Sequence, residues 1–263
     1  AGLEQLQNQN VLVKNEDGAG SGVVITKNIG GNNINFVITT AHIVDTSRVV
    51  KRVVDANKNI VEKIEFKDVV VKMEKFDDKE HVIEYSTTAK IVAFIDTDDE
   101  HDFAILMINK HGFTNITTKF IDNYNISVGD TVHIVGNPDG EPGINTMSKG
   151  IISRKHRYVN GCDFLQINSG VMPGFSGGGI YNEKNEYIGM LVGRRSETIG
   201  LGISFDKIRK WCGEAGYSFL FDNNSIPKSL KDIESIPIES HKAHVSLTLI
   251  QLNIPIKQWR KQK

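Results

Sequence analysis

Short runs of β-branched and aromatic residues recur along this chain, and each run is bounded by Gly, Asn or Asp. Examples are residues 23–25, 36–38, 90–95 and 131–135. Glycine (24 residues) greatly outnumbers proline (6), so sharp turns between such runs form easily. Short strands that alternate with turns in this way are typical of antiparallel sandwiches and barrels. The sequence therefore predicts an all-β fold.

A single short helix is predicted after these runs. Asp206 can cap a helix over residues 206–214, and Ile208 and Trp211 form a narrow apolar stripe along it. Helical periodicity is scarce elsewhere, so this helix is expected to be an addition to a β-sheet protein.

The composition changes at residue 223, where the chain becomes rich in Ser, Lys and Ile. We interpret residues 223–263 as a C-terminal extension of the compact unit. Within it, residues 244–249 alternate like a strand and residues 257–263 are basic. The extension is either a solvated end with one strand added to the core or a partner-docking strand, and the first interpretation is favoured.

The chain carries almost no net charge, with 31 Lys and Arg residues against 32 Asp and Glu residues. No nucleic-acid partner is expected, because binding a phosphate backbone needs a basic surface. No membrane span is expected either, because no stretch approaches the ~20 apolar residues that a span requires. We therefore predict a soluble protein. It begins at Ala1 without a leader segment, which suggests a processed form and leaves its compartment open.

No metal or other cofactor is expected. Cys162 and Cys212 lack the paired Cys or His spacing of a metal site and are too few for a disulfide scaffold. Whether they pair with each other stays open. Residues 18–22 resemble a phosphate-binding loop only superficially, because a strand follows them and the Gly-Lys-Ser/Thr ending is missing. We predict a turn there.

The strongest local signal for chemistry is Ser176, which lies in the sequence Pro-Gly-Phe-Ser-Gly-Gly-Gly at residues 173–179. Glycines let the backbone turn sharply and bring N–H groups close to a ligand. Such a motif alone is as often a tight turn as a catalytic site, so partner residues decide its meaning.

A serine hydroxyl becomes a good nucleophile when a base removes its proton, and His42 is the candidate base. It closes the apolar run of residues 35–42, so a strand would hold its ring at a defined point. The other histidines lack such a setting.

Asp102 is the candidate partner of His42, because a carboxylate is needed to orient the imidazole. It directly precedes the apolar run of residues 103–106, whereas Asp98, Asp99 and Glu100 have the character of solvated loop charges. Asp102 is therefore the acid best placed to be partly buried beside the His42 ring, and we favour it as the partner.

The chain order His42, Asp102, Ser176 excludes one enzyme class. In α/β-hydrolases a helix follows the serine, and the acid and the histidine come after it. Residues 177–193 instead have the pattern of a β-hairpin.

Six segments, taken in order, resemble the chymotrypsin-like serine proteases: residues 20–25, 38–44, 102–106, 135–138, 150–153 and 173–178. The bacterial HtrA/Deg branch is the most similar. The stretch around residues 182–186 also resembles staphylococcal glutamyl endopeptidases.

The resemblance implies a chymotrypsin-like pair of antiparallel β-barrels with the active site between them, followed by a short helix. We expect the first barrel, with His42 and Asp102, within residues 1–118 and the second, with Ser176, within residues 119–222.

The resemblance also implies the role of each residue. Ser176 would attack the scissile carbonyl, His42 would act as general base and then as acid, and Asp102 would orient His42. The N–H groups of Gly174 and Ser176 would form the oxyanion hole.

Two residues depart from the family pattern. Phe175 stands where Asp or Asn is usual, and Gly179 stands where Pro is frequent. Without an acid at position 175, a new N-terminal amine cannot switch the site on as it does in trypsin. The loop is then either constitutively formed or ordered by something else, such as an activating partner, and we hypothesise the second.

The resemblance places five residues around the primary pocket: Gly170 at its base, and Val192, Gly193, Arg194 and Gly202 in its walls. The base carries no carboxylate, so a preference for Lys or Arg is not expected. Leu191 replaces the histidine of glutamyl endopeptidases. A small or medium apolar side chain is the expected preference, and the alternative is an acidic residue attracted by Arg194 and Arg195.

These observations predict a serine endopeptidase that hydrolyses protein or peptide substrates through an acyl-enzyme. The alternative is a catalytically silent, protease-like binding module, which the departures at Phe175 and Gly179 keep open.

Overall fold

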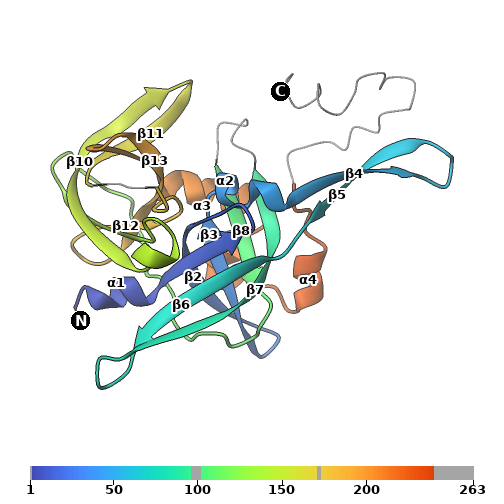
Figure 1. Cartoon of the computed structure of the whole chain (residues 1–263), viewed down its shortest axis with the longest axis horizontal. Coiled ribbons are helices and arrows are strands. Elements are labelled where there is room, and N and C mark those ends of the chain that lie inside the picture. Colours follow the sequence, from blue (N-terminus) through green and yellow to red (C-terminus); the bar gives the residue numbers. More distant parts are fainter. Residues whose placement is uncertain (1, 96–101, 171–172, 240–263) are drawn as a thin grey trace.

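The structure, a computed structural model, describes residues 2–95, 102–170 and 173–239. Its strands form two closed antiparallel β-barrels and one separate two-stranded sheet (Figure 1). The predicted all-β, double-barrel fold is confirmed.

The first barrel is hydrogen-bonded in the order β1-β2-β3-β8-β7-β6. Its strands are β1 Asn10–Asn15, β2 Gly18–Ile29, β3 Asn32–Thr39, β6 Val69–Phe76, β7 Val82–Ile95 and β8 Phe103–Ile108. Successive side chains of a strand point to opposite faces. On β3, Val37 packs inside this barrel, while Phe36 and Ile38 pack into a core shared with the second barrel. Burial of both faces explains why the run of residues 36–38 is continuously apolar.

The separate sheet is the hairpin of β4 (Arg48–Val54) and β5 (Ile60–Phe66), which lies in the chain between β3 and β6. It projects away from the barrels (Figure 1). A hydrogen bond from Lys67 N–H to Ser47 O at 2.8 Å closes its base.

The second barrel is hydrogen-bonded in the order β10-β11-β14-β13-β12-β9. Its strands are β9 Thr131–Gly136, β10 Thr146–Val159, β11 Cys162–Asn168, β12 Gly179–Tyr181, β13 Tyr187–Ser196 and β14 Ile199–Ser204. The pair β12–β13 is the hairpin predicted to follow Ser176, and that prediction is confirmed.

Helices are few and short. The α-helices are α1 Glu4–Asn8, α2 Ala41–Val44, α3 Phe205–Glu214 and α4 Leu230–Glu234, and the 3₁₀ turns are η1 Asp45–Ser47, η3 Glu141–Gly143, η4 Ser218–Leu220 and η5 Asn223–Ser225. The predicted helix is α3, and its Ile208 and Trp211 are buried as expected. Trp211 stacks on Phe103 of the first barrel with ring centroids 4.9 Å apart. The helix that follows the second barrel thus packs on the first.

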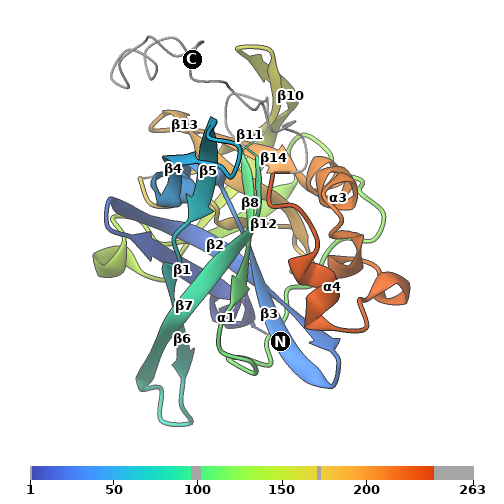
Figure 2. The same ribbon diagram turned by 90° about the vertical axis from the view of Figure 1, so that its right-hand side faces the viewer.

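The chain after α3 also contacts the first barrel. Ile233 of α4 is buried in the shared core, and α3 and α4 lie on one side of the molecule (Figure 2). Phe94 N–H donates to Ile238 O at 2.9 Å, and the guanidinium of Arg48 binds the carboxylate of Glu239 at 2.5 and 3.1 Å. The strand expected at residues 244–249 and the basic end lie outside the described residues. The division of the chain at residues 118 and 222 stays a prediction.

The turn predicted at residues 18–22 is wrong, because β2 begins at Gly18. The glycines serve close packing: a Cβ on Gly20 would lie 2.6 Å from Ile43, and one on Gly22 would lie 2.5 Å from Val37.

Cys162 and Cys212 are both free thiols. Burial raises the pKa of the Cys212 thiol well above its usual range. Within the described ranges, no helix has the length and apolar character needed to cross a membrane.

Candidate active site

His42 lies in α2, a short helix directly after β3, and not at the strand end as predicted. The strand stops at Thr39, and Thr40 is still extended (φ −83°, ψ 147°) before the chain turns. Ala41 and Val44 anchor the helix in the first barrel's core, whereas the His42 side chain is 36% exposed. An unbroken apolar run carries no mark of this change from strand to helix.

Asp102 contacts His42 at two points. One carboxylate oxygen accepts the backbone N–H of His42 at 2.9 Å, and the other lies 2.5 Å from the ring Nδ1. Burial lowers the pKa of His42, but the hydrogen bond and charge of Asp102, helped by Asp45, raise it above its ordinary value. A carboxylate at Nδ1 leaves Nε2 as the proton acceptor of the neutral ring. Asp98, Asp99 and Glu100, the weaker candidates, lie outside the described residues.

Among the described residues, two other histidines face carboxylates. His81 Nδ1 lies 3.0 Å from Asp77, and His156 Nδ1 lies 2.9 Å from Asp163. Their side chains are 70% and 66% exposed, against 36% for His42. Water competes for such exposed pairs, so neither matches the His42 setting.

Ser176 lies in the turn of residues 173–178, which packs against the first barrel. Ser21 N–H donates to Ser176 O at 2.8 Å. A Cβ on Gly177 would lie 1.8 Å from Ser21 O and 2.8 Å from Thr39 Oγ1, so the turn meets the strand end that leads to His42. The Ser176 hydroxyl donates to Val192 O at 3.1 Å, and the described residues show no hydrogen bond from it to His42.

The N–H groups predicted to form an oxyanion hole, those of Gly174 and Ser176, are oriented by the carbonyl groups before them. Pro173 O accepts Asp139 N–H at 2.9 Å, and Phe175 O accepts Gly178 N–H at 2.8 Å. The N–H of a trans peptide points away from its carbonyl, so the N–H groups of Gly174 and Ser176 point away from these contacts. Within the described part of the chain, both N–H groups are without an acceptor. Gly174 has φ +97°, which favours glycine.

Phe175 is an apolar anchor where the resemblance expects an acid. It is buried in the shared core, and its ring lies so close to Gly136 that a Cβ there would be 2.6 Å away. Gly179 leaves room for Tyr181, whose nearest ring carbon would lie 2.5 Å from a Cβ at position 179.

The residues predicted for the primary pocket differ in setting. A Cβ on Gly170 or Gly193 would meet none of the described residues within 4 Å, so the described structure leaves the space in front of both open. Val192 and Arg194 flank Gly193 along β13. A Cβ on Gly202 would lie 2.7 Å from the Ile180 side chain, so Gly202 faces the barrel interior.

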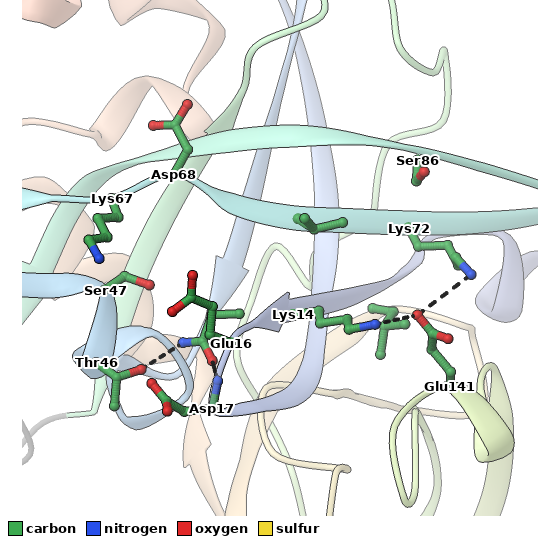
Figure 3. Close-up of a pocket in the computed structure, with 13 residues that line it drawn as sticks. Lys14, Glu16, Asp17, Thr46, Ser47, Lys67, Asp68, Lys72, Ser86 and Glu141 are labelled. Carbon is green, nitrogen blue, oxygen red and sulfur yellow. Dashed lines mark hydrogen bonds and ion pairs between the residues drawn. The ribbon is translucent and has the colours of Figure 1, made fainter.

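A hollow of about 580 Å³, which no sequence motif indicated, lies beside the first barrel (Figure 3). It has mixed charge, and its charged lining residues are Lys14, Glu16, Asp17, Lys67, Asp68, Lys72 and Glu141. Asn15, which lines this hollow, donates its Nδ2 to the carbonyl oxygen of Ile43 at 3.0 Å. Ile43 directly follows His42 in the chain. The hollow is therefore next to the site but contains none of the predicted catalytic residues.

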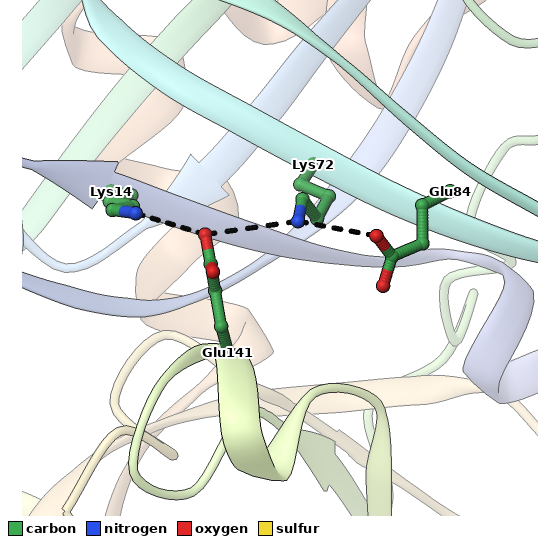
Figure 4. Close-up of polar contacts among 4 residues, drawn as sticks. All are labelled: Lys14, Lys72, Glu84 and Glu141. Carbon is green, nitrogen blue, oxygen red and sulfur yellow. Dashed lines mark hydrogen bonds and ion pairs between the residues drawn. The ribbon is translucent and has the colours of Figure 1, made fainter.

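An ion-pair ladder crosses one edge of this hollow (Figure 4). Glu141 of η3 lies 2.9 Å from Lys14 and 3.8 Å from Lys72, and Lys72 lies 3.4 Å from Glu84. These side chains join the loop after β9 to the first barrel. Most of them are about half exposed, so water screens each pair and its contribution to stability is small.

The described residues contain no group of three or more His, Cys, Asp or Glu side chains that could hold a metal ion. Two fully buried polar residues behind the serine turn, Ser21 and Asn137, received no role from the sequence. Both lie in segments that carry the family resemblance, which is the signal that could have pointed to them.

Comparison with known proteins gives a family. Residues 20–190 match the trypsin-like peptidase domain. Serine protease Do-like HtrA of Bacillus subtilis (strain 168) is 25% identical over 250 residues, which cover 90% of this chain and 48% of that protein. A serine protease HtrA-like protein of Staphylococcus aureus (strain MRSA252) is 26% identical over 236 residues, covering 84% and 26%. The chain thus spans half or less of these relatives.

Solved structures share the fold. The serine endoprotease from Yersinia pestis has a TM-score of 0.55 and 21% identity, with 85% of this chain and 68% of that chain covered. Deg5 has a TM-score of 0.55 and 20% identity, with 79% and 88% covered. At these identities the likeness establishes the fold alone.

Proposed function

Because the chain belongs to the trypsin-like peptidase family, with an HtrA-like protease domain, we propose that it is a serine endopeptidase with Ser176 as nucleophile. The observation that carries this proposal is the two-point contact between Asp102 and His42, beside a serine turn with two unpaired N–H groups among the described residues. These are the parts that acyl transfer to a serine requires.

The reaction begins with a change in the serine side chain. A substrate N–H that binds Val192 O displaces the Ser176 hydroxyl, which then turns about its Cα–Cβ bond toward His42. Oγ attacks the scissile carbonyl carbon while Nε2 of His42 takes the hydroxyl proton. The carbonyl oxygen becomes negative and binds the N–H groups of Gly174 and Ser176.

The tetrahedral intermediate then collapses. The C–N bond breaks, and His42 gives its proton to the leaving amine, which leaves an acyl ester on Ser176. Water attacks this ester with His42 again as the base. The new acid is released and the serine hydroxyl is restored. Asp102 stabilises the imidazolium that forms whenever His42 carries the transferred proton.

We also propose cleavage after small or medium apolar residues. The open space in front of Gly170 and Gly193 supports a pocket without a charged base. A peptide library with varied residues before the scissile bond tests this. Cleavage mainly after Asp or Glu would instead favour attraction by Arg194 and Arg195.

The contacts of the loop around Ser176 do not support the hypothesis that an activating partner orders it. Pro173 O and Phe175 O already have donors, and Phe175 is buried, so we propose that the oxyanion hole is constitutively formed. A partner that raises activity many-fold would contradict this.

A fluorophosphonate probe tests the function directly. We expect labelling of the native chain and none of Ser176→Ala, with hydrolysis lowered by about 10⁶. Ser127→Ala, which removes an exposed serine, is the matched control and should keep full labelling. A native chain that resists labelling between about pH 5 and 9 would favour the silent binding module.

A further inference from the structure

We propose that Ser21, set in place by Asn137, is a positioning residue that holds the oxyanion-hole loop from the opposite barrel. This inference rests on the proposed function. In this chain position 175 is Phe and cannot hold the loop through an acid. We infer that Ser21, near the start of β2, holds the loop instead.

Ser21 binds two carbonyl groups of the loop. Its hydroxyl donates to Gly174 O at 2.7 Å, and its backbone N–H donates to Ser176 O at 2.8 Å. The other carbonyls of the turn, those of Pro173 and Phe175, have donors within the second barrel. Ser21 therefore binds the two carbonyl groups of the turn that the second barrel leaves unbound. Along the chain these carbonyl groups alternate with the peptide groups whose N–H groups would bind the oxyanion.

The Ser21 hydroxyl uses its full hydrogen-bonding capacity. A hydroxyl has one donor and two acceptor positions. The donor goes to Gly174 O, while the oxygen accepts Asn137 N–H at 2.9 Å and Asn137 Nδ2 at 3.1 Å. Ser21 and Asn137 are both 0% exposed. Because both side chains are buried and hydrogen-bonded to each other, each restricts the other to one orientation.

Asn137 is tied to the first barrel in turn. Its Nδ2 carries two hydrogens, which are shared among Ser21 Oγ, Val11 O at 3.1 Å and Gly20 O at 3.2 Å. Its Oδ1 accepts Asn10 Nδ2 at 2.8 Å and Asn145 N–H at 2.9 Å. One side chain thus joins strands β1 and β2 to both ends of the loop after β9.

The loop after β9, residues 137–145, completes the support. Its Asp139 N–H holds Pro173 O, and its Glu141 reaches Lys14 and Lys72 through the ladder of Figure 4. The buried Asn137 contacts and the exposed Glu141 contacts therefore anchor the same loop at different points. The oxyanion-hole turn lies between this loop and Ser21, and both are fixed to the first barrel.

Removal of the Ser21 hydroxyl frees Gly174 O, so the peptide groups at residues 174 and 175 can reorient. Loss of one whole oxyanion donor lowers the rate about 10²- to 10³-fold. For a loosened but present donor we expect Ser21→Ala to lower kcat about 10- to 100-fold, with KM changed less than about 3-fold.

Affinity for a peptide aldehyde gives a readout that a merely structural role would not move. The aldehyde forms a tetrahedral adduct whose oxygen occupies the oxyanion hole, so its inhibition constant should rise by the same factor as kcat falls. Uncleaved peptide binding, measured with Ser176→Ala and with Ser21→Ala combined with Ser176→Ala, should stay unchanged.

Thr118→Val is the matched control. Thr118 Oγ1 is buried and donates to Val24 O of β2 at 2.8 Å, but it does not contact the loop. We expect Thr118→Val to lower thermal stability while kcat and aldehyde affinity stay unchanged. Ser21→Cys keeps the volume with a weak donor and acceptor, so its kcat should lie between native and Ser21→Ala. It supplies the same readouts where Ser21→Ala does not fold.

The outcomes separate the two proposals. If the native chain is active and Ser21→Ala or Ser21→Cys keeps full kcat and aldehyde affinity, this inference is wrong while the proposed function stands. Equal losses in Ser21→Ala and Thr118→Val would also overturn it, because buried hydroxyls would then matter only for stability. A native chain without Ser176-dependent activity would overturn both.

Discussion

Asp102 uses both carboxylate oxygens on a single residue, His42. One oxygen binds the backbone N–H at 2.9 Å, and the other lies 2.5 Å from Nδ1 of the ring. The ring is therefore tied through Asp102 to its own main chain at the start of α2. A single carboxylate sets both the tautomer and the direction of the imidazole.

Replacing Asp102 with Asn should remove activity without unfolding the chain. The amide can present an N–H to Nδ1, which reverses the tautomer and leaves Nε2 protonated. We expect kcat to fall by about 10⁴, as the same change does in other serine proteases of this fold. Asp77→Asn, which makes the same change beside the exposed His81, should leave kcat unchanged. A fall of less than about 10-fold in Asp102→Asn would speak against the assigned role.

Activity should depend on pH through His42. The ring must be neutral to accept a proton, and Asp102 raises its pKa above the ordinary value of 6.5. We therefore expect kcat/KM to rise with pH through an inflection above 6.5. In Asp102→Asn burial remains while the carboxylate is gone, so any residual activity should show a lower inflection.

The contribution of His42 to folding stability should fall as pH rises, whereas activity should increase. A folded-state pKa above the unfolded value favours the protonated form, so the stability that His42 contributes is present at low pH and lost as pH rises through the folded value. Comparing native and Asp102→Asn unfolding at about pH 5 and pH 8 measures this difference. An equal difference at both pH values would contradict the raised pKa.

Two glycines with similar backbone angles should respond differently to alanine. Gly177 (φ +90°) lies against Ser21 O, whereas at Gly161 (φ +83°) an added Cβ would meet nothing within 4 Å. Gly161→Ala should cost about 1–2 kcal/mol through backbone strain alone. Gly177→Ala should cost about 3 kcal/mol or more, because the serine turn must move from the first barrel. Thermal unfolding measures both, and similar losses would contradict the close packing of the turn.

Glu74 offers a stabilising substitution. It is 9% exposed, lies opposite Glu84 across β6 and β7, and accepts Asn145 Nδ2 at 3.3 Å. Burial raises its pKa, and the charge of Glu84 adds to the effect. The folded chain therefore favours the neutral form, and stability falls as pH rises through the folded pKa.

Glu74→Gln should keep the hydrogen bond and remove the charge. We expect it to raise the unfolding temperature at about pH 7 more than at about pH 4, because the penalty for the buried charge grows as pH rises. Glu62→Gln, on the partly exposed strand β5, is the control with little effect at either pH. A destabilised Glu74→Gln at neutral pH would show that the ionised carboxylate is favourable there.

Local pattern was enough for several elements of this fold, although it missed α2 and the start of β2. The apolar run at residues 36–38 marked a strand, and the spacing of Ile208 and Trp211 marked α3, because strand and helix periodicity are properties of neighbouring residues. The glycines around Ser176 likewise indicated a tight turn that exposes N–H groups. The resemblance then supplied the double-barrel arrangement.

The sequence by itself determined which residue types were available for chemistry: a serine among glycines, a histidine after a strand and an aspartate before another. Tertiary structure alone decided what holds them. Ser21 meets Gly174 across 153 positions of the chain, and Asn137 meets Ser21 across 116. Contacts at such separations arise only when two barrels close and pack, so no local period encodes them.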